Sequence, residues 1–299
     1  MADGGDIADI FVEGTGGVRL HLRGRALDAA GIPVLLVHGL ASNAALWDGV
    51  AAHLAALGHP VAAVDQRGHG RSAKPDTGYD FATVTSDLVA VASALGWQPA
   101  SDRRPVVAGQ SWGGNVALEL AARHPQAARA LVLVDGGTIE LVDQFADWPT
   151  CRAALTPPNF NGTTVGRLRR MLRAAHPDWP PEGIEGTLAN FEVLPDGRVS
   201  PWLDRRHHME IVRHMWDHRP SERYPRIGVP VMLIPAEADS VPSARWMGSK
   251  RDQVARAEKA LPVSLTRWIR GDHDLHAQHP AEVADLVHAA AEPSTFNRS

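Results

Sequence analysis

The feature that most constrains this chain is a serine between two glycines, preceded by a short apolar run. The run covers residues 106–108, the sequence Gly-Gln-Ser-Trp-Gly follows at 109–113, and residues 116–123 have helical character. On such a sharp strand-to-helix turn the serine hydroxyl projects above the sheet, and the glycines let strand and helix approach closely. The turn also places the amide of Trp112 at a helix N-terminus, where free N–H groups can stabilise an oxyanion. Ser111 is therefore a candidate nucleophile.

Strands and helices are predicted to alternate on both sides of this turn. Apolar runs typical of buried strands occur at residues 33–37, 61–64, 106–108, 131–134, 229–234 and 264–269, and 18–22 has the alternation of an antiparallel strand. Helical patterns occur at residues 44–57, 81–95, 116–123 and 280–291. This order predicts an α/β fold with a mostly parallel, doubly wound sheet.

The alternation stops between about residue 138 and residue 226. Short amphipathic runs at 166–175 and 205–218 are separated there by prolines, and Asp196-Gly197 predicts the turn of a small hairpin. We therefore expect one core domain formed by residues 1–137 and 227–299. Residues 138–226 are expected to form a mainly helical cap, or lid, over Ser111.

Composition limits the class of protein and its compartment. A chain of 299 residues with 44% hydrophobic and 21% charged residues suits one large globular domain, and a net charge of -4 gives no reason to expect nucleic acid or a membrane as partner. Cys151 is the single cysteine, so no internal disulfide can form and a reducing, cytoplasmic compartment is expected. Residues 1–14 lack the apolar segment of a signal peptide, and no apolar run reaches membrane-spanning length.

Four separated motifs occur along the chain in the order typical of one superfamily. They are His38-Gly39, Asp65-x-Arg67-Gly68-His69-Gly70-x-Ser72, Gly109-x-Ser111-x-Gly113 and Gly271-Asp272-His273. With them the chain resembles the α/β-hydrolase superfamily over nearly its whole length. The Gly-x-Ser-Trp-Gly-Gly turn and the inserted segment resemble its capped branch, which holds esterases, lactonases, carbon–carbon hydrolases and cofactor-free haloperoxidases.

The chemistry of a serine nucleophile agrees with this resemblance. A serine hydroxyl needs a histidine base, which is itself oriented by a carboxylate. In this superfamily the three residues follow the chain order Ser, Asp or Glu, His, so Ser111 and His273 are the expected nucleophile and base. The resemblance implies an oxyanion hole formed by the backbone amides of Leu40 and Trp112. His38 is expected to support this loop by hydrogen bonding.

Two aspartates compete for the role of the orienting carboxylate. Asp239 lies in the segment 235–242, where the superfamily usually keeps its acid, although Ala236 replaces the usual glycine. Asp135 directly follows the strand predicted at 131–134, a position that some capped relatives use instead. We expect Asp239 to be the acid and keep Asp135 as the alternative, which could equally be a turn residue.

Other conspicuous residues are expected to have structural roles. His214 and His218 have i,i+4 spacing that could suit a metal, but no Glu-x-x-His companion occurs, so we expect them to face solvent or pack. No metal and no cofactor are expected. The segment 65–72 is expected to be a structural turn with Arg67 in ion pairs, and Cys151 to be inert. Trp112 is expected to line the substrate pocket because it adjoins Ser111.

The leading hypothesis is a cofactor-independent serine hydrolase that cleaves a small or medium apolar ester or lactone through an acyl-enzyme. A carbon–carbon bond hydrolase or a perhydrolase would use the same residues. A low-turnover ligand-binding receptor on the hydrolase scaffold is the alternative from another class. The expected partner is a small-molecule substrate, and the chain is expected to be a monomer or a homodimer.

Overall fold

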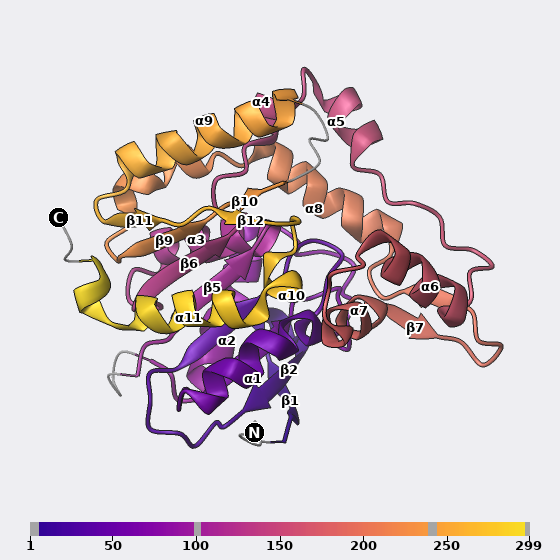
Figure 1. The fold of residues 1–299 in the computed structure, drawn as a ribbon, viewed down its shortest axis with the longest axis horizontal. Helices are drawn as coiled ribbons and strands as arrows, with labels where there is room; N and C mark the ends of the chain where they lie inside the picture. Colours follow the sequence, from indigo (N-terminus) through magenta and orange to yellow (C-terminus); the bar gives the residue numbers. More distant parts are fainter. Residues whose placement is uncertain (1–5, 99–102, 239–243, 297–299) are drawn as a thin grey trace.

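An eight-stranded sheet lies at the centre of the computed structural model, which describes residues 6–98, 103–238 and 244–296 (Figure 1). From edge to edge its strands are β1 (Ala8–Glu13), β2 (Arg19–Arg25), β4 (Val61–Asp65), β3 (Val34–Val37), β5 (Val106–Gln110), β6 (Ala130–Val134), β9 (Val231–Ile234) and β11 (Ser264–Thr266). The β1–β2 and β2–β4 pairs are antiparallel and the others are parallel. The predicted mostly parallel sheet is therefore confirmed.

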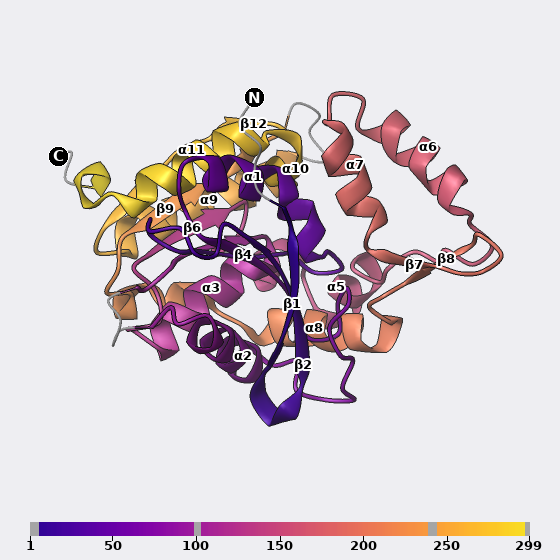
Figure 2. The same ribbon diagram turned by 90° about the horizontal axis from the view of Figure 1, so that it is seen from below.

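Helices cover both faces of the sheet (Figures 1 and 2). One face packs against α1 (Asp48–Ala56) and α11 (Pro280–Ala291), and the other against α2 (Phe81–Ala94), α3 (Trp112–Arg123) and α9 (Ala244–Ala260). Within β3, Val34 and Leu36 belong to the first apolar core, whereas Leu35 and Val37 belong to the second. The two-residue period of a strand thus supplies apolar side chains to both layers, which is why these strands are continuous apolar runs.

Residues between β6 and β9 interrupt the alternation of strands and helices with a series of short elements. They are α4 (Leu141–Gln144), α5 (Trp148–Ala154), α6 (Val165–Ala175), α7 (Pro181–Leu188), β7 (Phe191–Val193), β8 (Val199–Pro201) and α8 (Arg205–Asp217). The β7–β8 pair is the hairpin predicted at Asp196-Gly197. In Figures 1 and 2, α6, α7 and this hairpin extend away from the sheet on the right. A function of this segment as a lid stays a prediction.

The elements α4, α5 and α8 contribute apolar residues to the second core, whereas a third apolar cluster attaches α6, α7 and the hairpin to the rest of the chain. Trp179 and Ile184 of the insertion share it with Leu46 and Ala277 of the core. Leu46 lies in the 3₁₀ helix Ala44–Trp47, and Ala277 lies in the short helix α10 (Leu275–Gln278). The insertion therefore contacts the core beside the segments that contain His38 and His273.

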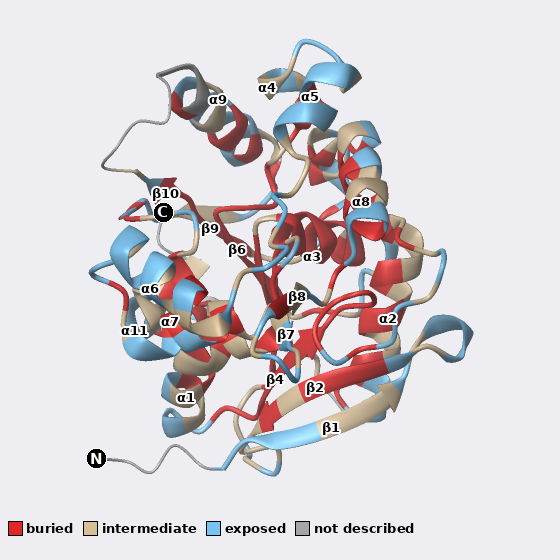
Figure 3. Cartoon of the chain, turned by 90° about the vertical axis from the view of Figure 1, so that its right-hand side faces the viewer, coloured by how far each residue is buried: buried red, intermediate tan, exposed pale blue. Residues whose placement is uncertain are grey.

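Two local predictions differ from the structure. The strand β1 has no predicted counterpart, because it is exposed or half-buried along its whole length and has no strong apolar pattern (Figure 3). The helix predicted at 44–57 begins instead with the 3₁₀ turn Ala44–Trp47. The amides of Ala44 and Ala45 donate to the side chains of Asp65 and Asn43, and the α-helix itself begins at Asp48.

The remaining short elements complete the chain. They are β10 (Ala236–Glu237) paired with β12 (Ile269–Arg270), and the 3₁₀ turns Thr15–Gly17, Pro220–Glu222, Tyr224–Arg226 and Pro293–Phe296. Within the described ranges, none of the helices has both the length and the apolar character needed to cross a bilayer.

A buried ion pair ties the loop after β4 to α2. The Arg67 Nε and Nη2 atoms donate to the two carboxylate oxygens of Asp87 at 2.7 and 2.8 Å. The side chains are 3% and 4% exposed, and Arg67 Nη2 also donates to the carbonyl of Thr15. This confirms the structural role expected of the segment 65–72.

Removal of one partner should be costly, because the other charge is left buried and unpaired. We predict that Arg67→Met lowers the free energy of unfolding by about 3–5 kcal/mol in urea titrations monitored by circular dichroism. The control is Arg206→Met, which breaks the Arg206–Asp76 pair whose side chains are 63% and 90% exposed. That change should cost less than about 1 kcal/mol, and equal losses in the two variants would contradict the prediction.

Candidate active site

Ser111 lies on a strained turn between β5 and α3. Its backbone has φ 53° and ψ -122°, which costs a non-glycine residue about 1–3 kcal/mol. A Cβ atom at Gly109 would lie 2.2 Å from the carbonyl oxygen of Gly113, and one at Gly113 would lie 2.4 Å from that of His38. Only glycine fits at both positions. The strand, turn and helix predicted around Ser111 are therefore present.

Unusual backbone conformations occur together at the carboxyl ends of the central parallel strands. Among the described residues, four non-glycine residues have positive φ, namely Ala26, Ala41, Ser111 and Asp135. The last three follow β3, β5 and β6, which are neighbours in the sheet. Strain of this kind persists where the surrounding structure enforces it and is concentrated at functional sites, and the carboxyl ends of parallel strands are where such folds bind ligands.

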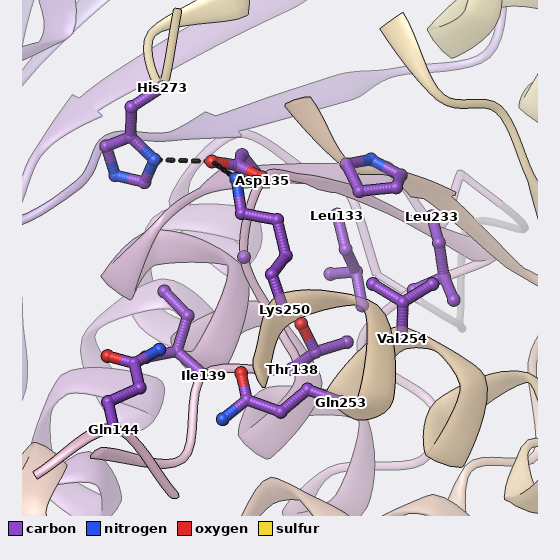
Figure 4. A pocket seen from close by; sticks show the side chains of 12 residues that line it. Leu133, Asp135, Thr138, Ile139, Gln144, Leu233, Lys250, Gln253, Val254 and His273 are labelled. Carbon is purple, nitrogen blue, oxygen red and sulfur yellow. Dashed lines mark hydrogen bonds and ion pairs between the residues drawn. The ribbon is translucent and has the colours of Figure 1, made fainter. Parts of the chain in front are cut away.

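Asp135 and His273 form a direct pair at the carboxyl ends of these strands (Figure 4). His273 Nδ1 lies 2.6 Å from Asp135 Oδ2, and the Asp135 side chain is only 3% exposed. The amide of Ala236 donates to Asp135 Oδ1 at 2.9 Å. Lys250 Nζ lies 2.8 Å from Oδ1 and 2.9 Å from Oδ2. Both oxygens of this buried carboxylate are thus satisfied by donors.

These contacts set the charge states of the pair. Burial opposes the ionised form of Asp135, but the hydrogen bond from His273 and the charges of His273 and Lys250 outweigh it and lower the pKa of the carboxyl. The His273 side chain is 50% exposed; partial desolvation opposes its protonation, yet the hydrogen bond and charge of Asp135 raise the pKa of the imidazole. At neutral pH the carboxylate is ionised and the imidazole can take up a proton.

The expected acid, Asp239, lies outside the described residues, so its assignment stays a prediction. In the described part of the chain the carboxylate that contacts His273 Nδ1 is that of Asp135. The sequence placed Asp135 directly after a strand but left its role open between acid and turn residue. Its positive φ of 42° and its three donors are tertiary features that the sequence pattern does not reveal.

Backbone packing brings Ser111 close to the segment that contains Asp135 and to the loop of His273. A Cβ atom on Gly136 would lie 2.2 Å from the carbonyl oxygen of Ser111. Gln110 Nε2 donates to the carbonyl of His273 at 3.1 Å. Among the described residues, Ser111 Oγ and His273 Nε2 make no hydrogen bond with each other. Such contacts are often long in unliganded enzymes and shorten when substrate binds.

The two amides expected to form an oxyanion hole are available. Neither the Leu40 nor the Trp112 backbone N–H has a hydrogen-bond partner in the described part of the chain. A Cβ atom on Gly39 would lie 3.1 Å from Ser111 Cβ, so the loop after β3 passes directly beside the serine. Donors from two adjacent segments can therefore point to an oxygen that develops negative charge next to Ser111.

Two buried histidines hold this loop. His38 Nδ1 contacts the carbonyl oxygen of Gly39 at 2.7 Å, and its Nε2 accepts from the amide of Gln66 at 3.0 Å. His69 Nε2 accepts from the amide of Ala41 at 3.3 Å. Burial lowers the pKa of both imidazoles, which keeps them neutral and able to accept. His38 thus has the supporting role expected of it, and the role of His69 was not foreseen.

The side chain of Trp112 is part of the core rather than of an open pocket. It is 1% exposed and its ring stacks on His69, with centroids 5.6 Å apart. The expectation that it lines the substrate pocket is therefore wrong. The first residue of α3 projects into the packed layer between helix and sheet, so its ring is buried while its amide faces the turn.

The insertion is bonded to the loops on both sides of Ser111. His176 Nδ1 and Trp179 Nε1 lie 3.0 and 2.9 Å from Asp272 Oδ2, next to His273. Asn43, which follows the loop of Leu40, donates a hydrogen bond from its side-chain Nδ2 to the carbonyl of Gly186 at 2.8 Å.

His218, which the sequence offered as a possible metal ligand, is buried, and its Nε2 lies 3.1 Å from Glu119 Oε2. The described residues contain no group of three or more His, Cys, Asp or Glu side chains arranged for a metal ion.

A small cavity of about 30 Å³ lies beside the Asp135–His273 pair. Figure 4 shows its lining, which includes Thr138, Ile139, Gln144, Lys250 and Gln253. The Gln144 Oε1 atom is buried and has no partner in the described structure. A space of this size suits one water molecule rather than a substrate.

Comparison with known proteins identifies the family. The model of the alpha/beta hydrolase family matches residues 34–286. The chain belongs to this family. A 2-(acetamidomethylene)succinate hydrolase of Mesorhizobium japonicum is 31% identical over 249 residues, which is 83% of each chain. Lipase LipV of Mycobacterium tuberculosis is 40% identical over 168 residues, 55% of this chain and 59% of that protein.

Solved structures share the fold. The crystal structure of E-2-(acetamidomethylene)succinate hydrolase superimposes with a TM-score of 0.72 at 21% identity, covering 98% of this chain and 100% of the other. Alignments with some curated relatives are partial. Uncharacterized proteins of Mycobacterium tuberculosis and Mycobacterium bovis match at 34% identity over 119 residues, about a third of their length.

Proposed function

We propose that this protein is a cofactor-independent serine hydrolase that cleaves a small or medium apolar ester or lactone. In this proposal Ser111 is the nucleophile, His273 the base, and Asp135, rather than the first-expected Asp239, the orienting acid. The observation that carries the proposal is the contact at 2.6 Å between the buried Asp135 carboxylate and the half-exposed His273 imidazole, which lies beside a serine in a strained strand-to-helix turn. The family and the names of its members support a hydrolytic reaction.

The arrangement suits acyl transfer in two steps. Ser111 Oγ attacks the substrate carbonyl carbon while His273 Nε2 accepts its proton, and the carbonyl electron pair moves to an oxygen bound by the Leu40 and Trp112 amides. Collapse of this intermediate breaks the bond to the leaving group, which takes the proton from His273. Water then attacks the acyl-enzyme in the same way and releases Ser111. Asp135 holds Nδ1, so that Nε2 faces the serine in its basic form.

A carboxylate-bearing N-acyl enamine is a second candidate substrate. The 2-(acetamidomethylene)succinate hydrolase matches 83% of this chain, more than the lipase does. The same serine, histidine and amides would serve for cleavage of an amide as for an ester, because both pass through an oxyanion intermediate. An assay should therefore include this compound beside p-nitrophenyl esters and lactones.

The nucleophile is tested with this substrate panel. We predict that Ser111→Ala lowers kcat about 10³-fold or more on whichever compound the native protein turns over. The variant should keep its Tm within a few degrees, since the change removes one oxygen. Ser42→Ala is the matched control, because Ser42 lies near the loop of Leu40 and has no assigned role. Turnover by Ser111→Ala at the native rate would refute the proposal, and so would a native protein that turns over no compound.

The identity of the acid is tested by a pair of variants. Asp135→Asn should lower kcat about 10⁴-fold, as loss of the orienting carboxylate does in other triads, because the imidazole then loses its oriented, basic form. Asp239→Asn should stay within about threefold of the native kcat, since this change removes no triad member. The opposite ranking of the two variants in steady-state kinetics would return the role to Asp239.

A further inference from the structure

Lys250 makes a contact with the acid of the candidate triad that the proposed reaction does not use. It lies on α9, and its ammonium bridges both oxygens of Asp135, at 2.8 and 2.9 Å. The same Nζ atom donates to the carbonyl of Ala236 at 3.1 Å. The side chain is 15% exposed, and Figure 4 shows it extending along the small cavity to the carboxylate. The three donor positions of the ammonium are therefore all directed to this site.

The carboxylate is consequently shared between two cations when His273 is protonated. Oδ2 accepts from His273 Nδ1 and also from Lys250. An isolated carboxylate would stabilise the imidazolium with its whole charge, whereas a neighbouring ammonium cancels part of that field. The positive charge of Lys250 accordingly lowers the pKa of His273, against the increase caused by Asp135, and it helps to lower the pKa of Asp135.

Other charged groups also face this pair and must be counted. Among the described residues, Asp274 interacts with both His273 and Asp135, and His276 interacts with His273. Asp272 and His176 interact in turn with Asp274, and His38 with His276. Asp274 favours the imidazolium, as Asp135 does. Burial keeps His276 neutral, with its pKa lowered to about 3. The charge of Lys250 therefore offsets the two aspartates that favour the imidazolium.

We propose that Lys250 is a positioning residue that keeps Asp135 ionised and in place and sets the pH above which His273 acts as a base. This inference rests on the proposed function. With Lys250 present, the imidazole loses its proton at a lower pH, so the reactive neutral form extends further into the acidic range. Without it, Asp135 would hold the imidazolium more tightly and the histidine would stay protonated up to a higher pH.

The test uses two variants without charge and two controls. Lys250→Met removes the charge at similar length, and Lys250→Gln keeps a donor and provides a second variant if the first does not fold. Lys250→Arg retains the charge. Lys259→Met is the second control, because it removes an exposed lysine from the same helix, α9. The readouts are the pH profile of kcat/KM and an NMR titration of His273, whose signal among the 15 histidines is assigned with His273→Gln.

We expect the acidic limb of kcat/KM and the His273 titration to move up together by about one pH unit in Lys250→Met and Lys250→Gln. Lys250→Arg and Lys259→Met should stay within about 0.3 unit of the native protein, since the charge at Asp135 is unchanged. An unchanged titration in both uncharged variants would overturn the proposal, and so would an equal shift in Lys250→Arg.

The NMR readout separates this inference from the proposed function. A native protein without hydrolytic activity in which His273 still titrates higher in Lys250→Met would refute the proposed reaction while supporting the coupling. An active enzyme whose His273 titration does not respond to Lys250 would do the reverse. Loss of kcat at all pH values with an unchanged titration would indicate that Lys250 is only a structural brace, which contradicts the proposal.

Discussion

The site depends on one buried carboxylate. Asp135 is 3% exposed, and a charge in that environment is tolerated only if donors satisfy it. Its donors come from β10, from α9 and from the loop before α10. Because leaving this charge unpaired would be costly, the segment of Asp135 and the three segments of its donors are held in fixed positions relative to one another. Because the adjoining Gly136 packs against Ser111, the same constraint fixes the position of the nucleophile relative to the base.

Strain and tight packing complete this arrangement. Ala41, Ser111 and Asp135 all have positive φ, and each follows a strand of the same parallel group. Their conformations are kept because the loops are crowded: Gly39 adjoins Ser111, and His69 binds the amide of Ala41. A preorganised oxyanion site needs this rigidity, since amides that must reorient during the reaction contribute less to catalysis. His38 and His69, which are buried and neutral, hold the loop after β3 rigid without adding charge.

Local pattern was sufficient for the buried parallel strands and the strand-to-helix turn, because buried strands and a Gly-x-Ser-x-Gly turn each have a short-range signature, whereas the exposed edge strand β1 has none. It was insufficient wherever tertiary contacts decide. Asp135 and Asp239 both follow strands, and their order in sequence does not distinguish them. Lys250 contacts a residue 115 positions away, and no spacing rule relates the two. Trp112 adjoins the nucleophile in sequence, yet its ring points into the core, because the direction of a side chain at a helix start depends on the packing around it.

The central claim is that Ser111 is a nucleophile activated by His273. The most direct measurement is mass spectrometry of the protein after reaction with a fluorophosphonate, with peptide mapping of the adduct and with the labelling rate followed against pH. The account predicts one adduct per chain, on Ser111, that forms faster as His273 loses its proton and does not form in His273→Gln. An adduct on another residue, or labelling of Ser111 at the same rate without His273, would contradict the account.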